Sequence, residues 1–115
     1  WKGDFTYTQA LEKGTAFYLD QLFEDSTIPK MTPTSLYPID IQSCAQAIIT
    51  LGEVLPESDS KKELLSMVYN WTMSHMYDEK NSYFYYRIYN SRVDKTAYIR
   101  WGQSWMLRAL PYLMK

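Results

Sequence analysis

Hydrophobic positions recur at helical spacing near the start of the chain. Tyr7, Leu11 and Tyr18 lie three or four residues apart or at multiples of that spacing, and charged residues occupy the other side. This pattern predicts a half-exposed amphipathic helix over residues 7–23. A polar segment with three prolines follows over residues 25–38 and indicates an irregular connection.

A second helix is expected over residues 40–55, and it is apolar on nearly all sides. Asp40 is a favourable N-cap for it. The polar residues of this helix, among them Gln42 and Gln46, fall on one narrow edge. A helix of this kind is covered by neighbours on most sides, so we expect the glutamine edge to face a polar opening.

Two further helices complete the pattern. Ser60 and Glu63 form a capping-box sequence, which predicts an outer helix over residues 61–76. A last helix is expected over residues 100–114. Pro111 should kink it or end its regular part, because proline has no backbone N–H to donate.

Residues 83–89 and 95–99 are rich in β-forming side chains and predict a small β-hairpin before the last helix. Outer and inner helices otherwise alternate along the chain. The prediction is therefore a single all-α domain over residues 1–115, built of antiparallel helical hairpins as a partial (α/α) toroid. A plain four-helix bundle would expose one face of each helix more evenly.

Charge and composition exclude some classes of binding partner. The formal net charge is −1 and no basic block occurs, which argues against nucleic acid or an anionic membrane surface as a partner. The longest uncharged stretch is interrupted by Asp40, so no membrane insertion is expected. A lone Cys44 excludes an internal disulfide framework and suits a reducing compartment such as the cytoplasm. Aromatic residues reach 17%, which favours cores with polar grooves and binding surfaces.

Three motifs carry a resemblance to a known family: YPIDIQSCAQAI over residues 37–48, FYYRI over 84–88 and YIRWGQSWMLRAL over 98–110. With them the chain resembles a bacterial family of exopolysaccharide and surface-polysaccharide biosynthesis, whose (α/α)₆-toroid is similar to six-hairpin glycosidases. The resemblance implies that the chain is the C-terminal portion of a larger toroid and that its partner is a saccharide or polysaccharide.

Two details qualify what the resemblance implies. Some members carry the label delta-aminolevulinic acid dehydratase, which does not fit, because such an enzyme resembles a full (β/α)₈ barrel with paired lysines. Relatives commonly have histidine where this chain has Gln42. If that imidazole were the acid/base group of the family, this chain would lack it.

Asp40 is the candidate catalytic residue, because a carboxylate at the mouth of a toroid can act as a general acid or base. The alternative is a purely structural N-cap, worth ~1 kcal/mol. An inverting hydrolase needs a second carboxylate ~6.5–9.5 Å away, and only Asp40 qualifies here. Glycosidase, lyase and epimerase chemistry stay open for the longer protein, and the isolated chain is expected to be inactive.

The saccharide is expected to contact side chains at the inner-helix mouth. Gln42 and Gln46 share a helix face and can hydrogen-bond sugar hydroxyls or, alternatively, neighbouring loops. An arginine could bind an acidic sugar carboxylate, or it could instead pair with Asp40. The candidate binding residues are Tyr37, Gln42, Gln46, Tyr86, Arg87, Arg100, Trp101 and Gln103.

Two other functions fit the same sequence. The chain could be a helical protein–protein interaction module without catalytic activity, which self-associates into a homo-oligomer through exposed apolar helix faces. It could also be a freestanding four-helix domain without a ligand. No cofactor motif occurs, and His75 has no second histidine or cysteine close by, so no metal site is expected.

Overall fold

Helices occupy much of the chain in the computed structural model. The structure describes residues 5–113, without the side chains of residues 5, 6 and 101. The α-helices are α1 (Phe5–Gln21), α2 (Ile41–Val54), α3 (Asp59–Met76) and α4 (Ser104–Ala109). A π-helical turn (Ile99–Gln103) precedes α4, and a 3₁₀ turn (Leu110–Leu113) follows it.

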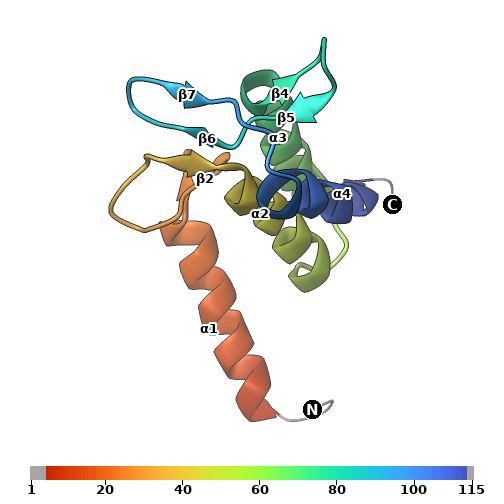
Figure 1. Ribbon diagram of the computed structural model, residues 1–115. Helices are drawn as coiled ribbons and strands as arrows, with labels where there is room; N and C mark the ends of the chain where they lie inside the picture. Colours follow the sequence, from red (N-terminus) through yellow and green to blue (C-terminus); the bar gives the residue numbers. More distant parts are fainter. Residues whose placement is uncertain (1–4, 114–115) are drawn as a thin grey trace.

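Helix α2 lies at the centre of the molecule and packs against α3 and α4 (Figure 1). Its first ten residues include Ile41, Cys44 and Ile48, none of which has any exposed surface. This confirms the expectation of an enclosed second helix. Helix α1 instead extends away from the other helices, and its C-terminal end meets β1 (Phe23–Glu24).

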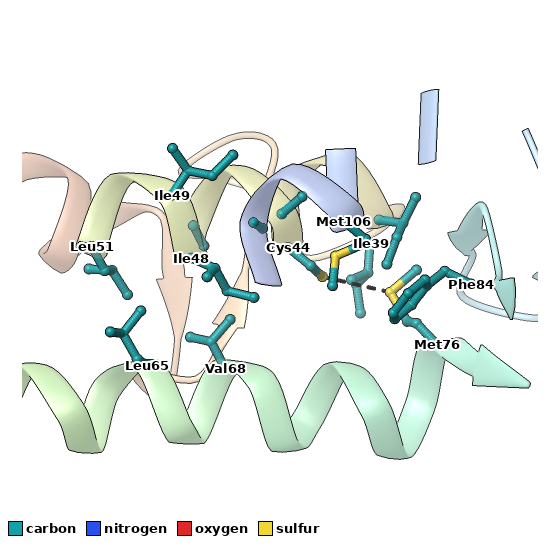
Figure 2. Close-up of a cluster of buried hydrophobic side chains, with 14 of the residues drawn as sticks. Ile39, Cys44, Ile48, Ile49, Leu51, Leu65, Val68, Met76, Phe84 and Met106 are labelled. Carbon is teal, nitrogen blue, oxygen red and sulfur yellow. Dashed lines mark hydrogen bonds between the residues drawn. The ribbon is translucent and has the colours of Figure 1, made fainter. Parts of the chain in front are cut away.

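The hydrophobic core joins α2, α3 and α4 (Figure 2). Val68 and Met76 from α3 and Met106 from α4 are fully buried with the apolar face of α2. The Cys44 Sγ lies 3.7 Å from the Met76 Sδ. Burial raises the pKa of the Cys44 thiol to about 12, so it stays protonated and serves as a packing residue.

Short strands make this a mixed α/β fold. The other strands are β2 (Ile28–Pro29), β3 (Ile39–Asp40), β4 (Tyr77–Asp78), β5 (Tyr83–Phe84), β6 (Arg87–Ile88) and β7 (Val93–Asp94). They form three small antiparallel sheets in the orders β1-β2, β3-β6-β7 and β4-β5. The all-α prediction was therefore wrong. Strands of two residues are too short to show an alternating pattern, and β3 and β6 pair across about half the chain.

The toroid prediction was also wrong. A toroid needs outer and inner helices that alternate around a ring, whereas here α1 stands apart and α2 lies between α3 and α4 (Figure 1). The amphipathic pattern of α1 resembled that of an outer helix. Yet Tyr7, Leu11 and Phe17 remain exposed, and only the C-terminal end of the helix, with Tyr18 and Leu19, packs against the core.

Two local predictions need correction. The expected hairpin between residues 83–89 and 95–99 does not form. Instead β5 pairs with β4, and β6 pairs with β7, whose residues Val93–Asp94 precede the expected second strand. The cap of α3 is Ser58, whose side chain accepts from the Lys61 backbone N–H at 3.1 Å, and not Ser60. The helix therefore begins two residues earlier than the capping box indicated.

The prediction for Pro111 is confirmed. Regular α-helix ends at Ala109, and Pro111 lies in the 3₁₀ turn that follows. None of the described helices combines the length and the apolar character that crossing a bilayer requires.

Candidate functional site

A hollow of about 370 Å³ opens between the end of α1, the β2 strand, the start of α2 and β6. It is lined by Tyr18, Leu22, Pro29, Lys30, Met31, Asp40, Gln42, Ser43, Gln46 and Arg87. The hollow brings together four of the residues that the sequence singled out: Asp40, Gln42, Gln46 and Arg87. We call it the α2 hollow.

Asp40 holds the start of α2 and one side of the hollow together. It is 4% exposed and ends β3, directly opposite Arg87 in β6. One carboxylate oxygen, Oδ1, accepts from the Gln42 backbone N–H at 2.7 Å, as an N-cap does. The other, Oδ2, accepts from the Arg87 Nε at 2.6 Å. Asp40 thus acts as both helix cap and anion partner, and its catalytic role stays a prediction.

Arg87 is fixed from two sides. The hydrogen bond that Arg87 donates to Asp40 is the main cause that raises the pKa of Arg87, and a hydrogen bond with the Tyr89 side chain raises it further. The guanidinium carbon also lies 4.7 Å from the centre of the Tyr86 ring. Its side chain is 27% exposed at the hollow. Arg87 is therefore permanently charged, and its guanidinium is fixed in position. The pairing with Asp40 is the one that the sequence offered as an alternative to binding a sugar carboxylate.

Gln42 and Gln46 line the hollow from the polar edge of α2. Both are exposed. The side-chain amide of Gln46 donates to the Thr50 hydroxyl at 3.0 Å, which orients it along the helix. A primary amide both donates and accepts, so each can pair with a hydroxyl-rich ligand. Their role as ligand-binding residues stays a prediction.

Tyr18 and Lys30 belong to the hollow although the sequence did not indicate them. Tyr18 stacks on Phe23 with ring centres 5.1 Å apart, and burial raises its pKa to about 12. The Lys30 Nζ donates to the Pro33 carbonyl oxygen at 3.2 Å. Lys30 lies in a segment without periodicity, and pairing of β1 with β2 brings that segment against α2. No local signal in the sequence pointed to it.

Several predicted binding residues lie elsewhere. The Gln103 side chain donates to the Phe84 carbonyl oxygen at 2.7 Å and accepts from the Phe84 N–H at 2.9 Å. It therefore pairs with β5 as a neighbouring strand would, and it serves the fold. Tyr37 and Arg100 are exposed and do not line the hollow. Tyr86 packs edge-on against Tyr98, with ring centres 4.6 Å apart.

Trp101 was also predicted to bind the ligand, but its side chain lies outside the part of the chain that the structure describes. Over the described residues, no group of three or more histidine, cysteine, aspartate or glutamate side chains could hold a metal ion. His75 instead stacks on Trp71 with ring centres 4.6 Å apart.

No protein-family model matches this chain, and no curated protein or solved structure is detectably similar to it. The class of protein therefore follows from the fold and the site alone. The chain is a mixed α/β domain with a polar hollow beside its central helix, α2.

Proposed function

We propose that this chain binds a saccharide in the α2 hollow, as part of a protein that acts in polysaccharide biosynthesis or modification. The observation that carries the proposal is the hollow itself. Its volume of about 370 Å³ falls within the ~300–1,000 Å³ of small-molecule sites. Its lining combines a held cation, Arg87, with the two amides of Gln42 and Gln46.

Sugar hydroxyls donate and accept hydrogen bonds, and so do the amides that line the hollow. The resemblance of the three sequence motifs to a polysaccharide-biosynthesis family supports the biological setting. Among the residues that line the hollow, Asp40 is the one carboxylate, and both of its oxygens already accept hydrogen bonds. We therefore propose binding in place of two-carboxylate hydrolysis. The single free Cys44 makes the cytoplasm the proposed compartment.

A test of the site is Gln46→Leu. The substitution keeps side-chain size and helix propensity but removes both hydrogen-bonding groups, so sugar affinity should fall roughly threefold to tenfold. Titration of the ¹⁵N-labelled chain with monosaccharides, followed by NMR, measures the dissociation constant and locates the perturbed amides.

The matched control for Gln46→Leu is Gln9→Leu, the same change on an exposed position of α1. Gln9→Leu should leave sugar binding unchanged. Equal losses in the two variants would contradict the proposal, as would amide shifts that do not cluster around residues 40–46.

A second function, self-association as a helical interaction module, is favoured by the exposed side of α1. Tyr7, Leu11 and Phe17 are 59%, 45% and 54% exposed, although such side chains gain stability from burial. The helix also extends from the rest of the molecule (Figure 1). We propose that a second copy of the chain covers this side.

Sedimentation velocity tests the association. The wild-type chain should form dimers at concentrations of about 100 µM, and Leu11→Glu with Phe17→Glu should shift it to monomer, because charges would be buried in the contact. Leu107→Glu is the control, since Leu107 is 73% exposed on a different helix. A wild-type chain that stays monomeric at the highest concentration would rule out this second function.

A further inference from the structure

We propose that the saccharide bound in the α2 hollow carries a carboxylate, as a uronic acid does, and that Lys30 is the residue that recognises its charge. The inference rests on the proposed saccharide site. It adds the class of sugar and a specificity-determining residue that the sequence did not indicate.

The charges that line the hollow are unequal. They comprise two cations, Lys30 and Arg87, and one carboxylate, Asp40. The Arg87 Nε and the Asp40 Oδ2 are 2.6 Å apart, so these two charges compensate each other. Lys30 is the remaining cation of the lining. A ligand with a single negative charge would neutralise the hollow.

Lys30 is poorly compensated by its own neighbours. Its nearest carboxylate is that of Glu24, 3.8 Å away, and the Glu24 side chain is 46% exposed. An ion pair of this kind is screened by water and contributes little. The Lys30 side chain is only 13% exposed, which reduces its own hydration. An ammonium group has three N–H donors, of which the Pro33 carbonyl and the Glu24 carboxylate can occupy two.

The position of Lys30 also separates charge recognition from hydroxyl recognition. Lys30 directly follows β2, whereas Gln42 and Gln46 project from α2 on a different wall of the hollow. A uronic acid has its carboxylate at one end of the ring and hydroxyls around the remainder. The arrangement therefore fits a sugar whose carboxylate meets Lys30 and whose hydroxyls meet the two glutamines.

The same geometry argues against a phosphate. Phosphate groups bind at helix N-termini through free backbone N–H groups and the positive end of the dipole. At the start of α2, the Asp40 carboxylate already accepts from the Gln42 N–H. The excess of one positive charge also suits a monoanion better than a dianion.

The experiment compares the wild-type chain with Lys30→Met and Glu24→Gln by NMR titration. The probes are glucuronate, galacturonate and mannuronate, each beside its neutral parent sugar, and inorganic phosphate. At least one uronate should bind wild type more tightly than its neutral parent. Lys30→Met should weaken that binding roughly tenfold or more while binding of the neutral sugar changes little. Glu24→Gln should tighten it roughly twofold to fivefold, because it removes the competing carboxylate.

Each other result has a definite meaning. Equal affinity for uronates and their neutral parents would overturn the inference and leave the saccharide site standing. Phosphate that binds at the same residues as tightly as any uronate would also overturn it and indicate a general anion site. If no sugar perturbs the hollow, the inference and the proposed function both fail. If Lys30→Met does not fold, Glu24→Gln still tests the inference, because it is expected to tighten uronate binding.

Discussion

Replacing Arg87 by methionine should lower the free energy of unfolding by about 3 kcal/mol. Asp40 is 4% exposed and relies on the Arg87 guanidinium at 2.6 Å. Removing one partner of a buried ion pair leaves an uncompensated charge and costs about 3–5 kcal/mol. We expect the lower end of that range, because the Arg87 side chain is 27% exposed and water can reach the site. Urea unfolding followed by circular dichroism measures the change.

Two further variants separate the charge effect from lost packing. Asparagine is as good an N-cap as aspartate. Asp40→Asn in the Arg87→Met background therefore keeps the cap of α2 and removes the unpaired carboxylate charge of Asp40. This double variant should be about 1 kcal/mol more stable than Arg87→Met alone. Arg92→Met is the control, since Arg92 is exposed in the loop between β6 and β7 and stacks on Tyr89. Equal unfolding midpoints for Arg87→Met and Arg92→Met would contradict the anchoring role of Arg87.

Truncating Met106 to alanine should cost about 3 kcal/mol. Met106 has no exposed surface and belongs to the cluster that joins α4 to α2 and α3 (Figure 2). Truncation of a buried methionine loses transfer free energy and leaves a cavity, at a cost of ~2–5 kcal/mol. A domain of this size has about 5–15 kcal/mol in total, so the thermal midpoint should fall by roughly 10 °C. Differential scanning calorimetry measures it.

The adjacent residue provides the control for Met106→Ala. Leu107 is 73% exposed, so Leu107→Ala should change stability by less than about 0.5 kcal/mol. The two substitutions remove side chains of similar size from neighbouring positions of one helix, and they differ in burial. If Leu107→Ala were as costly as Met106→Ala, then Leu107 would be covered in solution, and the burial of α4 described above would be incomplete.

Local signals in the sequence predicted much of the helical structure. Asp40 was expected as the cap of α2, and its carboxylate accepts from the Gln42 N–H. The expected first helix also forms, shifted to Phe5–Gln21. Such features depend on contacts within a few residues, which sequence spacing reveals directly. β5 and β6 fall within the predicted β-rich segment 83–89, although they pair with other partners than expected. The remaining strands were missed because two-residue strands carry no periodic signal.

The candidate site could be predicted only in part, for the same reason. Gln42 and Gln46 share one helix edge, so their common face follows from helical geometry. Arg87 reaches Asp40 across 47 residues, and the sequence offered this pairing as one alternative among others. Lys30 was missed entirely, because its place in the hollow depends on pairing of β1 with β2.

By itself, the sequence determined where α2 begins and ends, that this helix would be enclosed, and which of its edges would be polar. Those properties follow from short-range hydrogen bonds and from the spacing of apolar residues along one helix. Only the tertiary structure decided that most of α1 extends away from the other helices and that small sheets replace a ring of helices. It also decided that Lys30 and Arg87 line the same hollow as the two glutamines. Such contacts depend on which surfaces, far apart in the sequence, pack against each other. The spacing of residues within one element does not indicate this packing.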